Sequence, residues 1–287
     1  MRDNRLQVVR KSYRVKFQGA MGDSLAGIID RPDTTDPVPV VVLSHCFTCS
    51  KDLKAIVRVS RGLSERGIAV LRFDMTGIGG SRGDFSQTNF ATNLEDLRAA
   101  IRFAAGELGP VTTLYGHSFG GAASLALAGS NHPDDAAEPV LSSLRSVISL
   151  GSPSDTWHLA VRLTKMNPRI DIDGMGEVTI GGVAWTIRKQ MVDNYRQYDL
   201  ASRISRIKLP TLLLHSPIDE TVGFDHALRI MMLINQSQGE ASTPCCSLLS
   251  LPGADHLLKN DPRDLDFVVR TSAAMVHRYS QMPERLR

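Results

Sequence analysis

Short apolar runs alternate with segments of helical spacing along most of the 287-residue chain. A continuous run such as residues 38–43 is typical of a strand that is covered on both faces. Strands that alternate with helices predict the α/β class, with a mostly parallel central sheet and helices on both faces. The expected strands are residues 38–43, 68–73, 111–115, 147–150, 211–215 and 247–251, and the expected helices are residues 53–66, 93–105, 119–129 and 264–279.

The N-terminal region departs from this alternation. Residues 13–17 and 25–29, separated by a turn at Gly22-Asp23, predict an antiparallel hairpin. Residues 1–20 carry six Arg or Lys and one Asp. A solvated edge hairpin explains this charge better than a basic arm for anions. Because such an edge can pair with another copy, we expect a monomer or a homodimer.

Composition excludes several classes of protein. Apolar residues make up 42% of the chain, which excludes disorder and a mini-protein that needs cross-links. The formal net charge of +3 is too small for a dedicated nucleic-acid binder. No apolar run approaches the roughly 20 residues that cross a bilayer. No apolar segment of a signal peptide follows residues 1–5, so we expect a cytoplasmic protein without a membrane span.

Residues 154–200 interrupt the strand–helix rhythm. Within them, residues 178–185 have a Gly181-Gly182 turn that predicts a hairpin. We expect residues 1–153 and 201–287 to form the core and residues 154–200 to form a small cap insertion, although a purely structural excursion is the alternative. Five apolar residues of this segment either line a substrate pocket or pack the cap against the sheet: Trp157, Met166, Trp185, Ile187 and Met191.

A candidate nucleophile lies at the end of the strand formed by residues 111–115. Residues 116–120 read Gly-His-Ser-Phe-Gly and open a helix rich in Gly and Ala. A serine nucleophile needs this context, because a tight strand-to-helix turn exposes the serine hydroxyl and places it beside free N–H groups of the helix N-terminus. Ser118 is therefore the predicted nucleophile.

A serine hydroxyl needs a base to become nucleophilic near neutral pH. Asp219 follows the expected strand at residues 211–215, and His256 follows the one at residues 247–251. Because the carboxyl ends of parallel strands share one rim, we expect both side chains to meet Ser118 there. Asp255 is the main rival acid, but a residue next to the base reaches the far ring nitrogen poorly.

Two backbone N–H groups are expected to stabilise the oxyanion. One belongs to Phe119, directly after the nucleophile. The second comes from the loop after the strand at residues 38–43, with Phe47 as first choice and Cys46 as second.

The four cysteines leave two interpretations. Cys46-x-x-Cys49 together with the adjacent Cys245 and Cys246 resembles a zinc site, but adjacent cysteines rarely share one tetrahedral metal. Buried small hydrophobes are the favoured interpretation, and a disulfide framework is unexpected at this cysteine density. We therefore expect no metal and no cofactor.

These motifs resemble those of the α/β-hydrolase superfamily, serine-hydrolase branch, over nearly the whole chain. Residues 45–47 match its His-Gly-X oxyanion segment, residues 74–81 its D-x-x-G-x-G-x-S turn, and residues 116–121 its nucleophile elbow. Asp219 and His256 match the acid and the base, and Asp74 is expected to anchor its own turn. Residues 45–52 look like the hydrolase domain of bacterial fusions with an OsmC-like domain. No OsmC-like part is expected in this chain, which ends at Arg287.

The resemblance implies an α/β-hydrolase fold and a serine carboxylesterase that acts on small-molecule esters of short to medium acyl chains. Cys46 and Cys49 stand where many relatives have glycine. The alternatives within the same fold are a serine aminopeptidase-like enzyme, an acyl-peptide hydrolase and a thioesterase. A non-catalytic ligand-binding protein is the alternative from another functional class, because a fold alone does not give a function.

Overall fold

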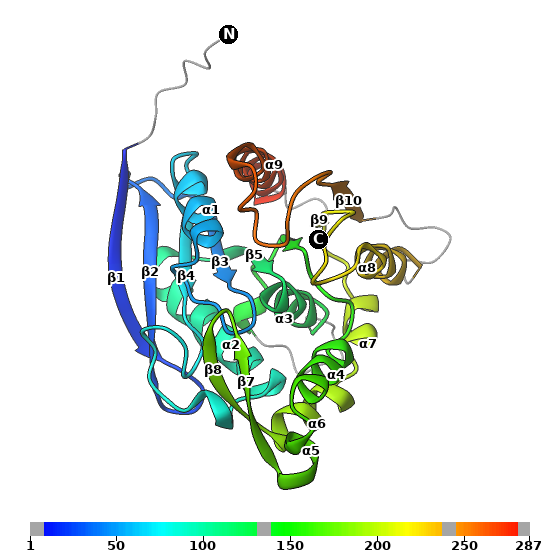
Figure 1. Ribbon diagram of the computed structural model, residues 1–287. Coiled ribbons are helices and arrows are strands. Elements are labelled where there is room, and N and C mark those ends of the chain that lie inside the picture. Colours follow the sequence, from blue (N-terminus) through cyan, green and yellow to red (C-terminus); the bar gives the residue numbers. More distant parts are fainter. Residues whose placement is uncertain (1–8, 131–138, 237–244, 281–287) are drawn as a thin grey trace.

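An eight-stranded sheet in the order β1-β2-β4-β3-β5-β6-β9-β10 forms the centre of the computed structural model, which describes residues 9–130, 139–236 and 245–280 (Figure 1). The N-terminal hairpin is antiparallel and pairs antiparallel with β4, and the other neighbours are parallel. The predicted, mostly parallel sheet is confirmed. Residues 1–8 of the basic N-terminal segment lie outside the described residues. The strands of the sheet are β1 (Arg10–Gln18), β2 (Ser24–Pro32), β3 (Val40–Ser44), β4 (Ala69–Phe73), β5 (Val111–His117), β6 (Ser146–Leu150), β9 (Thr211–His215) and β10 (Cys246–Ser250).

Helices cover both faces of the sheet, as the alternation predicts. Side chains of β3 divide between two cores, with Val40 and Val42 in one and Val41 and Leu43 in the other. Helices α2 and α3 pack into the first core, and α1 and α9 pack into the second. The helices outside residues 154–200 are α1 (Lys54–Ser64), α2 (Phe90–Leu108), α3 (Phe119–Ala128), α7 (Leu200–Ser205), α8 (Phe224–Gln236) and α9 (Pro262–Ser280). None of them, within the described part of the chain, has the length and apolar character of a membrane span.

A buried ion pair ties the N-terminal hairpin to the parallel strands. Arg72 Nε of β4 lies 3.1 Å from Asp30 Oδ2 of β2, and both side chains are almost fully buried. Burial raises the pKa of Asp30, but hydrogen bonds from Ser12, Ser60 and Arg72 outweigh it and hold the pKa below its usual value. Arg72 also donates to the carbonyl of Lys51 at 2.7 Å. The pair thus links β2, β4 and the loop after β3.

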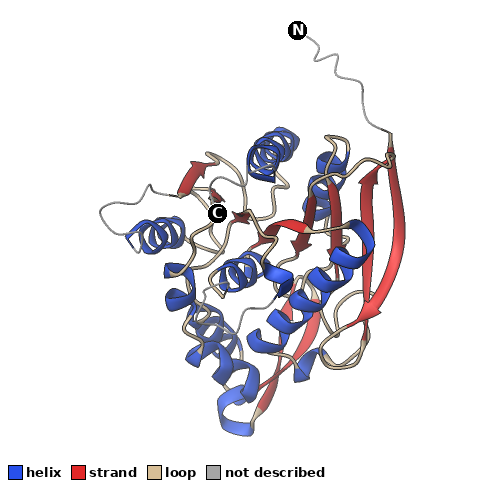
Figure 2. Cartoon of the chain, turned by 180° about the vertical axis from the view of Figure 1, so that it is seen from behind, coloured by secondary structure: helices blue, strands red, loops and turns tan. Residues whose placement is uncertain are grey.

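Residues 154–200 form a separate group of small elements: α4 (Trp157–Met166), α5 (Arg169–Asp173), β7 (Met175–Ile180), β8 (Val183–Arg188) and α6 (Lys189–Gln197). The expected hairpin is present, and Gly181 and Gly182 both have positive φ, as its tight turn requires. Both views show this hairpin at one end of the molecule, away from the main sheet (Figures 1 and 2).

Hydrogen bonds place this segment against the loops that follow the parallel strands. Gln190 donates to the carbonyl of Thr88 at 3.0 Å, and Asn194 accepts from the N–H of Phe90 at 3.0 Å. The two ends of the segment also meet, because Thr156 Oγ1 donates to the carbonyl of Tyr195 at 2.6 Å. The bonds of Gln190 and Asn194 join the segment to the end of the loop after β4 and to the first residue of α2, and its buried side chains belong to the same core as those of helices α2 and α3.

We predict that Arg72→Met destabilises the protein by about 3 kcal/mol, the low end for a broken buried ion pair, because it removes the buried cation of Asp30 and leaves only the more exposed Arg10, 3.2 Å away. Urea unfolding followed by circular dichroism measures the change in free energy. Arg270→Ala is the matched control, since Arg270 pairs with Asp266 on the surface, and we expect it to cost less than about 1 kcal/mol. Equal effects of the two substitutions would contradict the importance of burial.

Candidate active site

Ser118 occupies a strained turn between β5 and α3. Its φ is 55°, a left-handed backbone conformation that residues other than glycine rarely adopt. Its N–H donates to the carbonyl of Leu150 on β6 at 2.8 Å, and its carbonyl accepts from the N–H of Gly121 at 2.9 Å. These bonds hold the serine at the carboxyl end of the sheet, as predicted, although the residue is buried rather than exposed.

The glycines around Ser118 allow backbone segments to approach closely. A Cβ at Gly116 would lie 2.1 Å from the carbonyl oxygen of Gly120. A Cβ at Gly120 would lie 2.5 Å from the carbonyl oxygens of Ser44 and His45. The loop after β3 is therefore packed directly against the first turn of α3, just beyond the serine.

His256 links the serine to a carboxylate. Its Nε2 lies 3.0 Å from Ser118 Oγ, and its Nδ1 lies 2.6 Å from Asp219 Oδ2. The ring can therefore donate from Nδ1 to the carboxylate and accept the serine proton at Nε2. The three predicted side chains come together from the loops after β5, β9 and β10, which end at the same rim.

Asp219 is held by its own loop. Its Oδ1 accepts from the N–H groups of Thr221 at 2.8 Å and Val222 at 2.9 Å. Burial raises the pKa of Asp219, but the hydrogen bond from His256 and those from the two N–H groups outweigh it, so the pKa lies below its usual value. The carboxylate is therefore charged near neutral pH and faces His256.

The rival acid Asp255 has a different task. Its Oδ1 accepts from the N–H groups of Lys259 at 2.6 Å and Asn260 at 2.9 Å. These bonds shape the loop that carries His256, and Asp219 is the residue that contacts the ring.

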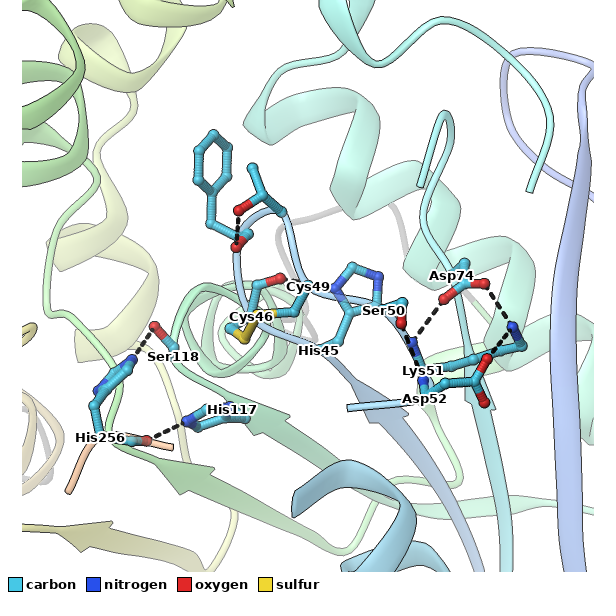
Figure 3. Close-up of a disulfide and its surroundings, with 12 residues drawn as sticks. His45, Cys46, Cys49, Ser50, Lys51, Asp52, Asp74, His117, Ser118 and His256 are labelled. Atoms are coloured by element: carbon cyan, nitrogen blue, oxygen red, sulfur yellow. Dashed lines mark hydrogen bonds and ion pairs between the residues drawn. A yellow bond between two sulfur atoms is a disulfide. The ribbon is translucent and has the colours of Figure 1, made fainter. Parts of the chain in front are cut away.

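His117 precedes the nucleophile in the motif, and the structure shows which residue it contacts. Its Nε2 donates to the carbonyl of His256 at 2.9 Å, and the two ring centroids are 5.1 Å apart (Figure 3). Burial, together with repulsion from His256, lowers the pKa of His117 to about 3. His117 therefore remains neutral and ties the loop of His256 to β5. The motif names this histidine, but its partner is far away in sequence.

Phe119 and Phe47 carry the two N–H groups that are predicted to bind an oxyanion. Phe119 is the first residue of α3, where an N–H has no partner within the helix. Within the described ranges, the N–H groups of Phe119 and Phe47 donate to no protein acceptor. The two rings are in edge contact, with centroids 5.6 Å apart, so the two residues are neighbours.

His45 orients the peptide between Cys46 and Phe47. The N–H of Met75 donates to His45 Nε2 at 3.2 Å, so the ring proton is on Nδ1, which donates to the carbonyl of Cys46 at 2.8 Å. In a trans peptide the N–H points opposite to the carbonyl, so the N–H of Phe47 is turned away from His45. Of the two expected donors in this loop, Phe47 fits this geometry better than Cys46.

The interpretation of Cys46 and Cys49 as separate buried residues or zinc ligands is wrong, because the two form a disulfide (Figure 3). The N–H of Cys49 donates to the carbonyl of Cys46 at 3.1 Å, and this tight turn brings the Cα atoms within 5.2 Å, a normal separation for a disulfide. The C-x-x-C spacing was the feature of the sequence from which this disulfide could have been predicted. Cys245 and Cys246 form no disulfide in the described part of the chain; Cys246 is buried as expected, whereas Cys245 is half-buried.

Asp74 anchors its turn as expected. Its carboxylate accepts from the N–H of Lys51 at 2.6 Å, from Lys51 Nζ at 2.8 Å and from the N–H of Gly80 at 2.8 Å. The turn after β4 and the loop after β3 are therefore fixed to each other.

The five apolar residues predicted for a pocket do not gather at one place. Ile187 and Met191 are fully buried in the core, which agrees with the packing alternative. Trp185 packs edge-on against Phe85 with centroids 4.7 Å apart. Trp157 and Met166 are exposed to 55% and 44%.

Tyr195 of α6 is the aromatic residue of this segment that approaches the serine turn. Its ring lies 5.8 Å from that of Phe119 and 6.3 Å from that of Phe47, centroid to centroid. Tyr195 is not among the predicted site residues, because its position in a polar helix carries no distinguishing pattern.

Comparison with known proteins agrees with this architecture. A family model described as "Serine aminopeptidase, S33" matches residues 35–175. The esterase domain of a Rhodothermus marinus protein is 34% identical, with a TM-score of 0.69 over 94% of this chain and 99% of that domain. None of the curated proteins compared matches the chain.

Two further solved structures share the fold at lower identity. Est1E from Butyrivibrio proteoclasticus, with ferulic acid bound, is 20% identical, with a TM-score of 0.74 over 92% of this chain and 98% of that one. The mouse alpha/beta hydrolase domain-containing protein 10 is 16% identical, with a TM-score of 0.69 over 93% and 99% of the two chains.

We predict that Gly120→Ala disturbs both the fold and the site, because its Cβ would collide with backbone oxygens of the loop after β3. We expect a clear fall in the thermal midpoint together with slower labelling of Ser118 by a fluorophosphonate. Gly106→Ala is the control, since a Cβ there meets nothing within 4 Å, and alanine in a helix is favoured over glycine by roughly 0.5–1 kcal/mol. A Gly120→Ala protein as stable and as reactive as the wild type would refute the close contact.

Proposed function

Because the chain belongs to the α/β-hydrolase superfamily, we propose that it is a serine carboxylesterase that hydrolyses small-molecule esters with short to medium acyl chains. The hydrogen-bonded series Ser118–His256–Asp219 is the observation that carries this proposal. The similarity to an esterase domain supports an ester as the bond that is cleaved.

In the proposed mechanism, Ser118 Oγ attacks the ester carbonyl while His256 Nε2 takes its proton. The ring then gives this proton to the leaving alcohol, and an acyl-enzyme remains. Water attacks the acyl-enzyme in the second half of the cycle, with His256 again as base. Asp219 keeps the ring proton on Nδ1 and stabilises the imidazolium that forms.

The oxyanion of each tetrahedral intermediate is proposed to bind the N–H groups of Phe119 and Phe47. Each such donor typically contributes about 2.7–4 kcal/mol of transition-state stabilisation. The bond from His45 to the carbonyl of Cys46, together with the turn that follows Phe47, restrains the Phe47 peptide, so this donor needs little reorganisation during the reaction.

Residues 154–200 are proposed to act as a cap over the site, with residues 1–153 and 201–287 as the core. The contact of Tyr195 with Phe47 and Phe119 supports this role. The aromatic rings at this contact favour an apolar acyl or alcohol group beside Ser118.

An aminopeptidase would need an acidic group to hold the free amine of its substrate. Among the candidate acids of residues 154–200, Asp155 pairs with Arg229 at 3.3 Å, and Asp193 pairs with Lys189 at 2.8 Å. These pairs make both carboxylates poorer amine ligands, whereas the third candidate acid, Glu177, is exposed and has no ion pair among the described residues, so the aminopeptidase stays an alternative. Amino-acid p-nitroanilides and acyl thioesters, compared with oxygen esters, separate the alternatives.

We predict that Ser118→Ala abolishes turnover of p-nitrophenyl acetate and butyrate, because it removes the nucleophile. Colorimetric assays of the purified protein measure the rate, and a fluorophosphonate should label the wild type alone. Unchanged turnover would remove Ser118 from the mechanism. Folded wild type without label would favour a non-catalytic binding protein.

We also predict that Asp219→Asn lowers kcat by about 10⁴-fold, because an amide no longer selects the Nδ1–H tautomer of His256. Asp255→Asn is the matched control, since Asp255 bonds only backbone N–H groups of its loop in the described part of the chain. We expect a much smaller loss there. If the control lost as much as Asp219→Asn, the assignment of the acid would be wrong.

A further inference from the structure

The disulfide lies in the loop that carries the proposed oxyanion donor Phe47, and nothing in the hydrolytic mechanism uses it. We propose that Cys46 and Cys49 form a reversible dithiol–disulfide site whose reductant is a dithiol, and that the disulfide keeps the loop in the form that supports catalysis. The coupling to catalysis rests on the proposed esterase function.

Both ends of this loop are anchored independently of the sulfur atoms. On one side, His45 accepts from the N–H of Met75 at 3.2 Å. On the other side, the N–H and the ammonium of Lys51 both bond Asp74. In Figure 3 the disulfide lies on the Ser118 side of His45, and the Lys51–Asp74 pair lies on the other side. Loss of the disulfide therefore affects the turn between the anchors rather than the fold.

The turn between the anchors is held in a costly conformation. Thr48 has a φ of 57°, which is unfavourable for a β-branched residue and persists only when its surroundings fix it. Within the turn, Thr48 Oγ1 donates to the carbonyl of Phe47 at 2.7 Å, and the N–H of Cys49 donates to the carbonyl of Cys46. The disulfide encloses Phe47 and Thr48 and adds the covalent restraint.

Relaxation of Thr48 would move the peptide groups next to it. The N–H of Phe47 is only one residue away, and an oxyanion donor acts only at about 2.7–3.1 Å from its oxygen. Reduction is therefore expected to weaken transition-state stabilisation while the apolar contacts that bind substrate persist. This predicts a lower kcat with a nearly unchanged KM.

The two sulfur atoms differ in access. Cys46 is buried, with 4% of its surface exposed, whereas Cys49 is half-buried. An incoming thiolate therefore reaches Cys49 Sγ first.

The Cys46–Cys49 disulfide is reduced by two successive thiol–disulfide exchanges. The first thiolate of the reductant bonds to Cys49 Sγ, the Cys46–Cys49 bond breaks, and Cys46 leaves as a thiolate that takes a proton. The second thiol of the reductant, as its thiolate, then attacks the reductant sulfur that is bonded to Cys49. This closes the reductant's disulfide and releases Cys49 as a thiolate, which is also protonated. Two electrons and two protons pass from the dithiol to the protein, and the reductant ends as a disulfide.

The test compares the air-oxidised full-length protein with the same protein reduced by dithiothreitol. Iodoacetamide labelling with peptide mass spectrometry reports the thiol state of each cysteine. Rates with p-nitrophenyl butyrate give kcat and KM. We expect reduction to lower kcat by about ten-fold or more, since complete loss of one donor costs about 10²–10³-fold. Reoxidation with diamide should restore it.

Two variants make the result specific. Cys46→Ser/Cys49→Ser should have the low kcat of the reduced protein and no response to dithiothreitol. Cys245→Ser/Cys246→Ser removes the two thiols outside the disulfide and should keep the full response. Thermal unfolding by circular dichroism should change little on reduction, because the closed loop is short and constrains the unfolded chain weakly.

Three outcomes would overturn the proposal: Cys46 and Cys49 labelled without reductant, full reduction with unchanged kcat, or a loss of kcat that accompanies global unfolding. If the oxidised protein turns over no ester, the proposed function fails. Fluorophosphonate labelling of Ser118 in the two states then decides the coupling, and equal labelling rates would refute it.

Discussion

The close approach of backbone to backbone at the end of β5 is the constraint on which the site depends. Ser118 can hold its left-handed turn because Gly116 and Gly120 let the strand, the helix and the loop after β3 come within contact of one another. The N–H of Ser118 is fixed by the neighbouring strand β6. With the hydroxyl fixed at the rim, the loops after β9 and β10 need only be short to bring a carboxylate and an imidazole to it.

The histidines around this rim divide their tasks by their hydrogen bonds. His45 and His117 each donate one N–H to a backbone carbonyl, and so does His215 to Val222 at 2.8 Å. Burial lowers the pKa of all three, so they stay neutral and act as fixed braces. His256 differs, because its two nitrogens face a carboxylate and a hydroxyl. In the proposed mechanism, His256 therefore transfers the protons while the other three rings hold the surrounding backbone.

The parts of this structure that could be read from the sequence are those set by chain-local rules. Apolar runs gave the parallel strands, and positions just after strands gave Ser118, Asp219 and His256, because topology alone brings strand ends together. The partner of His117 and the contact of Tyr195 could not be predicted, since each depends on the packing of distant segments. The disulfide was not predicted, because a low cysteine density argues only against a framework of several disulfides. A single four-residue turn can still bring two sulfur atoms together. Helix α8 was also missed.

The bond between Thr156 and Tyr195 closes the base of residues 154–200, so the chain leaves and re-enters the sheet region at almost the same point. The exposed tip of such an excursion, at Gly181 and Gly182, can change without altering strand order or the turn at Ser118, whereas buried residues such as Met191 belong to the core. Under the proposed cap role, grafting at this position changes substrate choice and leaves the bonds among Ser118, His256 and Asp219 in place.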